Sequence, residues 1–263
     1  MDSINYPGQS GKLPVVTVVA LVSFLFLITF TQNASAIADV RFLHLAPDAG
    51  PVNIWIDGRL IEQDLKFKEN TGYVELSPGQ HRVICKTKAG PNPQVLNSPF
   101  PFREDKEYTI SVTGNREAGD FQLVFVIDNC PPARSLAQVK FTNAVQNSPP
   151  TDLSIKYGPT LYSDLAFRTS GGCQLIPPDN YLFRLSETES GDLITEKKVE
   201  LKAGMRYNIF ATRSQKGGNT DLISLKKPNA PEEVPKIFGV ERSVLQVLGA
   251  GLIASLLILA LGR

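Results

Sequence analysis

Hydrophobic and polar residues alternate with a period of two through most of the middle of the chain. Residues 52–56 alternate in this way and end at Asp57-Gly58, a dipeptide that favours a two-residue hairpin turn. Residues 73–76 and 81–85 flank Pro78-Gly79, so the pattern predicts a second hairpin there. Further strands are expected at 108–112 and 122–126, and no amphipathic helix pattern is found between residues 39 and 230.

This strand pattern repeats about 100 residues later, a spacing that fits whole domains better than short solenoid units. The matching segments are 40–42 with 139–141, 64–67 with 164–167, 76–79 with 176–179, and 108–110 with 207–209. With about seven short strands expected in each repeat, the sequence predicts an all-β fold of two tandem immunoglobulin-like β-sandwich domains. Tyr108 and Tyr207 have the spacing of a tyrosine corner, in which the hydroxyl bonds to the backbone upstream; the alternative is two ordinary strand tyrosines.

Two apolar segments frame this middle part. Residues 13–30 follow Lys12 and precede the small-residue triplet 34–36, which is typical of a secretory signal peptide; an uncleaved N-terminal anchor is the alternative. Residues 244–262 carry no charge and are long enough to cross a bilayer as a helix. A buried core helix and a processed tail of a lipid-anchored protein are the other interpretations of this segment.

These features divide the chain into six expected segments. They are a signal peptide or anchor at 1–38, a first sandwich at 39–129, a proline-rich linker at 130–137, a second sandwich at 138–227, a proline-rich spacer at 228–241 and a transmembrane helix at 242–263. Arg263 ends the chain, which suits the cytoplasmic side of a membrane. The sequence therefore predicts a single-pass protein of the cell membrane, with the lipid bilayer around its C-terminal helix and both sandwiches on the extracellular or periplasmic side.

Charge and cysteine content narrow the function classes. The net charge of +1 gives no electrostatic footprint for nucleic acid. Cys85, Cys130 and Cys173 are too few for a disulfide framework, so we expect one disulfide with one free thiol and take Cys85 and Cys130 as the candidate pair. No C-x-x-C pair occurs, which argues against a zinc or redox site.

Residues 40–58 read VRFLHLAPDAGPVNIWIDG. This segment resembles the opening of modules in a bacterial cell-surface family known as domain of unknown function 4397. The matching positions are Val40, Arg41, Phe42, His44, Pro47, Asp48, Ala49, Val52, Asp57 and Gly58. The second repeat departs from the pattern, with Asn143, Gln146 and Asn147 in place of His44, Pro47 and Asp48. The resemblance implies secretion and a β-sandwich fold, and it implies no known reaction. A weaker similarity is to the AlgF-like periplasmic accessory proteins of polysaccharide O-acetylation.

Residues that could carry chemistry are few. His44 and Asp48 could form a catalytic dyad or bind a metal; the favoured alternative is a strand histidine followed by an aspartate that caps its own turn. Trp55 could be a stacking platform for carbohydrate, although a place in the core is preferred. The sequence has no phosphate-binding loop, HExxH helix, nucleophile elbow or EF-hand loop. We expect no catalytic residue, metal site or cofactor, and take His44, Asp48 and Trp55 as the candidate ligand site.

The function predicted from the sequence is that of a non-catalytic, membrane-anchored binding or structural protein of the bacterial cell envelope. Its partner is expected to be a polymer of the envelope or another envelope protein. One alternative is a periplasmic scaffold subunit of a polysaccharide-modifying or secretion complex. A hydrolase is less favoured, because it would need His44, Asp48 and a serine to converge in one pocket.

Overall fold

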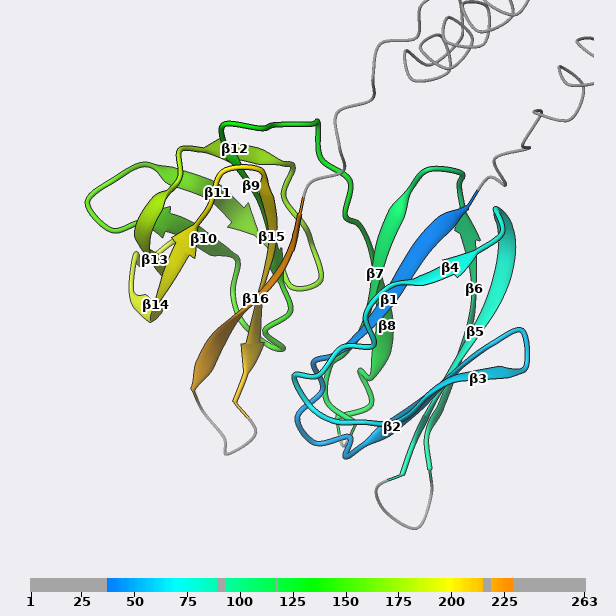
Figure 1. The fold of residues 1–263 in the computed structure, drawn as a ribbon. Coiled ribbons are helices and arrows are strands. Elements are labelled where there is room, and N and C mark those ends of the chain that lie inside the picture. The colour runs from blue at the N-terminus through cyan, green and yellow to red at the C-terminus, as the bar shows by residue number, and fades with distance from the viewer. Residues whose placement is uncertain (1–36, 89–92, 117, 215–218, 229–263) are drawn as a thin grey trace, which may run out of the picture. The chain divides into compact units, whose positions relative to one another are not determined.

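The computed structural model describes residues 37–88, 93–116, 118–214 and 219–228, and every regular element in these ranges is a β-strand (Figure 1). The first eight strands are β1 (Ala38–His44), β2 (Val52–Ile56), β3 (Arg59–Leu65), β4 (Val74–Leu76), β5 (Gly79–Thr87), β6 (Val95–Phe102), β7 (Glu107–Thr113) and β8 (Gln122–Ile127). The other eight are β9 (Ala137–Asn143), β10 (Thr151–Ile155), β11 (Thr160–Leu165), β12 (Gln174–Ile176), β13 (Asp179–Glu187), β14 (Leu193–Leu201), β15 (Met205–Arg213) and β16 (Thr220–Pro228). The predicted all-β fold is confirmed for this part of the chain, and the apolar segments 13–30 and 244–262 lie outside it.

The strands form four sheets of four strands each. Strands β1 to β8 make the sheets β4-β1-β7-β8 and β3-β2-β5-β6, and β9 to β16 repeat this order as β12-β9-β15-β16 and β11-β10-β13-β14. In each half one pairing is parallel, β1 with β7 and β9 with β15. Each pair of sheets encloses its own apolar core. We call β1–β8 the first sandwich and β9–β16 the second sandwich.

The strand order corrects the expectation of an immunoglobulin-like arrangement. An immunoglobulin domain places its first, second, fourth and fifth strands in one sheet. Here β1 lies between β4 and β7, and β2 belongs to the facing sheet. The repeated order in the second sandwich shows that this arrangement is a property of both halves of the duplicated sequence.

Of the two expected hairpins, the first is confirmed and the second is wrong. β2 pairs with β3 across Asp57 (φ 49°) and Gly58 (φ 83°), which both have the positive φ that a type I′ turn requires. By contrast, β4 pairs with β1, whereas β5 pairs with β2 and β6. The chain therefore crosses from one sheet to the other at Ser77-Pro78. Proline and glycine mark that bend correctly, but they do not specify which strands pair.

Both predicted tyrosine corners are present. The backbone N–H of Arg103 donates to the Tyr108 hydroxyl, and that of Lys202 donates to the Tyr207 hydroxyl, each at 2.9 Å. Both tyrosines are buried in the cores of their sandwiches. Each hydroxyl thus ties the loop before β7 or β15 to the strand that follows it.

Replacing Tyr108 or Tyr207 with Phe keeps the ring and leaves the loop amide without its acceptor. We expect the free energy of unfolding to fall by about 1–3 kcal/mol in each variant, measured by urea denaturation. Tyr157→Phe is the control, because this side chain is almost fully exposed. Unchanged stability in both corner variants would show that these bonds contribute nothing to the fold.

Candidate functional site

The outer face of the β4-β1-β7-β8 sheet is buried although it points away from the core. Val40 and Tyr108 belong to the core cluster of the first sandwich, whereas Arg41, Thr109 and Ser111 alternate with such residues and are buried as well. Residues of the second sandwich cover them. The contact between the two outer faces is called the joint below.

Asp128 directly follows β8 and is the central residue of the joint, with a carboxylate that is fully buried. It accepts hydrogen bonds from the hydroxyls of Thr109 (2.5 Å) and Tyr73 (2.7 Å), and it lies 3.4 Å from the Arg41 guanidinium. Burial and the Asp128 charge raise the pKa of Tyr73, which keeps its hydroxyl protonated as a donor. The first sandwich alone therefore provides three donors to this carboxylate.

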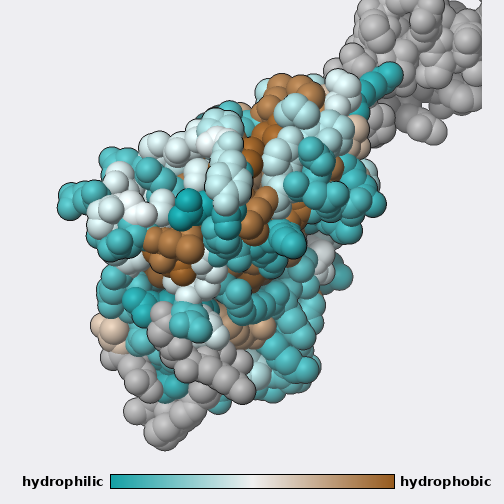
Figure 2. All heavy atoms as spheres, turned by 90° about the vertical axis from the view of Figure 1, so that its left-hand side faces the viewer, coloured by the Kyte–Doolittle hydropathy of each residue, from teal (hydrophilic) through white to brown (hydrophobic). Residues whose placement is uncertain are grey.

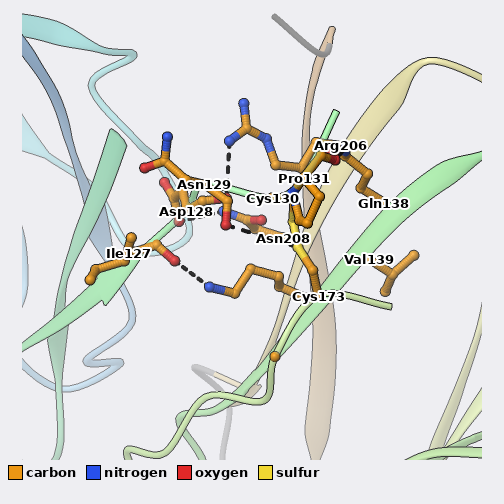
Figure 3. The surroundings of a disulfide bond; sticks show 12 residues. Ile127, Asp128, Asn129, Cys130, Pro131, Gln138, Val139, Cys173, Arg206 and Asn208 are labelled. Carbon is orange, nitrogen blue, oxygen red and sulfur yellow. Dashed lines mark hydrogen bonds between the residues drawn. A yellow bond between two sulfur atoms is a disulfide. The ribbon is translucent and has the colours of Figure 1, made fainter. Parts of the chain in front are cut away.

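The second sandwich adds further bonds to the same residue (Figure 3). Asn208 donates to the Asp128 carboxylate, and Arg206 donates to the Asp128 backbone oxygen at 3.0 Å. Arg206 also forms a buried ion pair with Glu107 at 2.8 Å. Glu107 and Arg206 occupy equivalent positions at the starts of β7 and β15, so the two copies of the repeat contact each other through matching positions with opposite charge.

Apolar residues continue the joint beyond the charged groups. Leu43 and Leu45 of the first sandwich cluster with Ala144 and Phe210 of the second, and all four are buried. The hydroxyl of Thr212 donates to the backbone oxygen of Leu45 at 3.1 Å. The joint therefore combines a buried ionic network with a separate hydrophobic core.

A disulfide closes the joint on the linker side. It connects Cys130, two residues after Asp128, to Cys173 between β11 and β12, with 5.7 Å between their Cα atoms (Figure 3). The expected pairing of Cys85 with Cys130 is wrong, because Cys85 lies inside the core of the first sandwich. Burial there raises the pKa of the Cys85 thiol to about 12, which makes it unreactive at neutral pH.

Asp128→Asn would leave Arg41 buried without its opposite charge. We expect a loss of about 3–5 kcal/mol in the free energy of unfolding, measured by urea denaturation, because a broken buried pair leaves an uncompensated charge. Asp221→Asn is the matched control: Asp221 pairs with Lys68 across the same two sandwiches, but both side chains are partly exposed. That variant should lose less than about 1 kcal/mol. Equal losses in the two variants would contradict the central role of Asp128.

His44 stabilises the loop between β1 and β2. Its ring is fully buried, the Ala46 N–H donates to Nδ1 at 3.2 Å, and Nε2 donates to the Gly50 oxygen at 2.7 Å. Burial lowers the pKa of His44 despite the nearby Asp48, which favours the neutral ring. Because both nitrogens are bonded to the backbone, this geometry argues against His44 as a general base or a metal ligand. Among the described residues, no group of three or more His, Cys, Asp or Glu side chains is placed to hold a metal ion.

Asn143 performs the same task in the second sandwich. Its side-chain oxygen accepts from the Val145 N–H at 3.0 Å, and its amide donates to the Leu165 oxygen at 2.9 Å. Each residue thus caps the amide two positions ahead, but the second bond differs: His44 donates to Gly50 in its own loop, whereas Asn143 donates to Leu165 at the end of β11. The departure of the second repeat from the His44 pattern therefore preserves the bond to the first loop amide.

The stability that His44 contributes should depend on pH, because its imidazole ring can be protonated. The asparagine found at the equivalent position 143 has no group that titrates. Because the pKa of His44 is lowered on folding, the unfolded chain binds the proton first, so stability falls as pH drops below the unfolded value of about 6.5. We expect His44→Asn to fold and to lose less unfolding free energy than the wild type between pH 7.5 and pH 5, measured by urea denaturation at both values. An identical loss in the two proteins would contradict this assignment.

Trp55 lies on the open outer face of the other sheet of the first sandwich. Ile54 and Ile56 enter the core, so the preferred core placement of Trp55 is wrong and its indole is half-buried on the opposite face. Leu60 on β3 and Ile84 on β5 pair directly with Trp55, which makes an apolar row across three strands. No described contact joins this row to the His44 loop.

The row, which we call the Trp55 platform (Leu60, Trp55 and Ile84), has cationic side chains beside it. The Lys86 ammonium lies 4.8 Å from the centroid of the Trp55 ring, a cation–π contact worth about 0.5–1 kcal/mol at an exposed site. A sequence signal for the platform lies in β5. Val83-Ile84-Cys85 is apolar at three successive strand positions, so it must present an apolar residue to each face.

Comparison with known proteins confirms the family resemblance. Residues 38–154 match the model of the family described as "Domain of unknown function (DUF4397)". No curated protein matches the chain.

Several solved structures are similar to this chain over about three quarters of its length. One is a Bacteroides uniformis protein with a proposed role in cell adhesion, with 11% identity and a TM-score of 0.26, covering 73% of this chain and 98% of that one. Another is a family 26 carbohydrate-binding module from Eubacterium rectale in complex with maltoheptaose, with 8% identity and a TM-score of 0.24, covering 74% and 98%. A third is the tip fimbrial protein Mfa3 of Porphyromonas gingivalis, with 8% identity and a TM-score of 0.22, covering 73% and 99%.

Proposed function

We propose that this protein is a non-catalytic binding protein of the bacterial cell envelope, held at the membrane with its two sandwiches outside the cytoplasm. The observation that carries the proposal is the Cys130–Cys173 disulfide. Disulfides form and persist in oxidising compartments and are rare in the cytosol. The disulfide connects the linker to the second sandwich. An oxidising compartment therefore stabilises the contact between the two sandwiches.

The sequence of the chain ends agrees with this location. Residues 13–30 have the pattern of a secretory signal, and residues 244–262 that of a membrane-spanning helix. Within the described ranges, no helix is long and apolar enough to cross a membrane. Membrane attachment through the C-terminal segment therefore stays part of the proposal.

The joint supports a binding role for the sandwiches. Buried bonds from both sandwiches to Asp128 hold the two copies of the repeat together as one unit. Their remaining outer faces and loops are then presented in a fixed relation, which suits recognition of an extended partner. His44, the residue that a hydrolase would need as a base, has both ring nitrogens bonded to backbone groups.

The disulfide gives a test of location and stability together. In cells of the native bacterium, a maleimide-PEG reagent applied after denaturation should modify one thiol per chain without reductant and three with it. Reduction of the purified protein should lower the free energy of unfolding by about 4 kcal/mol, because the bond closes a loop with a sequence separation of 43.

Cys85→Ala is the control, since it should keep the full response to reductant. Three reactive thiols in unreduced cells would contradict an extracytoplasmic location. Protease added to intact cells, or to cells with a permeabilised outer membrane, should also degrade the sandwiches.

A further inference from the structure

We propose that the Trp55 platform binds an acidic glycan, with a sugar ring stacked on the indole and an anionic substituent bound by Lys86 and Arg82. This inference rests on the proposed function and names the class of ligand for it. The platform lies on the open face of the β3-β2-β5-β6 sheet, the only outer sheet face of the first sandwich that the joint leaves uncovered.

The apolar part of the platform matches one face of a sugar ring. Leu60 is 44% exposed beside Trp55, and Ile84 flanks the indole on the other side. The face of an indole is electron-rich, so it attracts the slightly positive C–H groups that a pyranose ring presents on one side. A row of apolar side chains across three strands offers room for adjacent sugar units of a polymer.

The polar groups around the platform match the rest of such a ligand. Arg82 and Lys86 lie on β5 two positions before and after Ile84, so all three share one face. Arg82 donates to the Asn97 side-chain oxygen at 3.0 Å, and Asn97 lies opposite Ile84 on β6. Among the described residues, neither Arg82 nor Lys86 forms a salt bridge with an acidic side chain. Lys86 therefore remains available for an anionic ligand, and Arg82, which interacts electrostatically with Asp57 but forms no salt bridge with it, can add a second bond.

The position of Lys86 explains why the ligand should be acidic. The Lys86 ammonium lies over the ring of Trp55 in the free protein. A sugar that stacks on this ring therefore has to displace the ammonium. A carboxylate or phosphate on the glycan offers Lys86 a charge-assisted bond that is stronger than the contact it gives up. A neutral sugar displaces the ammonium without providing a replacement.

The equivalent face of the second sandwich shows that the fold does not require this platform. Ser154 on β10 occupies the position of Trp55, and its neighbour across β13 is Arg184. Arg184 and Lys156 both pair with Glu196, at 3.2 and 3.4 Å. Figure 2, which views the side on which Figure 1 draws β13 and β14, shows a mainly hydrophilic surface with separate hydrophobic patches. Both cations on this second face pair with Glu196, whereas Arg82 and Lys86 form no salt bridge within the described ranges.

The sole tryptophan of the chain makes the proposal directly measurable. Full-length protein in detergent would be titrated with an array of acidic oligosaccharides and their neutral forms, including oligogalacturonate and its methyl ester. We expect an acidic member to change the Trp55 fluorescence and to bind at least about tenfold more tightly than its ester. Trp55→Ala should lose at least about tenfold in affinity, whereas Trp55→Phe should retain part of it.

Two further variants separate the platform from other surfaces. Lys86→Ala should reduce the preference for the acidic form, with Arg82 still present, and leave binding of the ester unchanged or improved. Tyr157→Ala is the matched control on the second sandwich, because Lys156 lies 5.6 Å from that ring in the same kind of contact. Its affinity should equal that of the wild type.

Three outcomes would overturn the proposal. Acidic glycans that bind equally well to Trp55→Ala would place the site elsewhere and leave the proposed envelope function intact. Binding of no member of the array would exclude a glycan site, while the thiol and protease experiments would still decide the location. A wild-type dimer that Trp55→Ala converts to a monomer in analytical ultracentrifugation would assign the platform to a second copy of the chain.

Discussion

The buried carboxylate of Asp128 is the interaction on which the arrangement of the two sandwiches depends. A buried charge is costly unless it is paired and fully hydrogen-bonded. Here the partners come from both halves of the chain: Thr109 and Arg41 from the first sandwich, and Asn208 from the second. Separating the sandwiches would remove part of this set and expose the apolar cluster around Phe210. The linker disulfide lies beside the same residue, so covalent and ionic constraints act at one point.

The duplicated sequence has kept its cores and changed its surfaces. Tyr108 and Tyr207 form the same corner bond in both copies. At the joint the equivalent positions Glu107 and Arg206 have opposite charges and pair with each other. A like-charged pair at this buried position would repel, so divergence of the two copies made this contact favourable. Two identical copies could not have formed it.

Local sequence rules predicted the strands, the turn at Asp57-Gly58 and the tyrosine corners, because each depends on neighbouring residues alone. They failed where the outcome depends on partners distant in the chain. A period of two shows that Trp55 and Ile54 face opposite ways, but only packing decides that Ile54 faces inward. The same limit applies to Pro78, where β4 and β5 enter different sheets, and to Cys130 in the linker, whose partner Cys173 lies in the second sandwich. No local pattern in the sequence indicated that the charged residues of the joint would be buried.

The joint also determines which surfaces remain for binding. A two-layer sandwich has two outer faces, and the contact through Asp128 and Leu43 covers one face of each copy. In the first sandwich the remaining face carries Trp55 beside Lys86, whereas in the second it carries Glu196 paired with two cations. The Trp55 platform lies on the side of the first sandwich away from the joint. A ligand can therefore occupy it without breaking any buried bond, and the network around Asp128 can stay closed while the outer face exchanges partners.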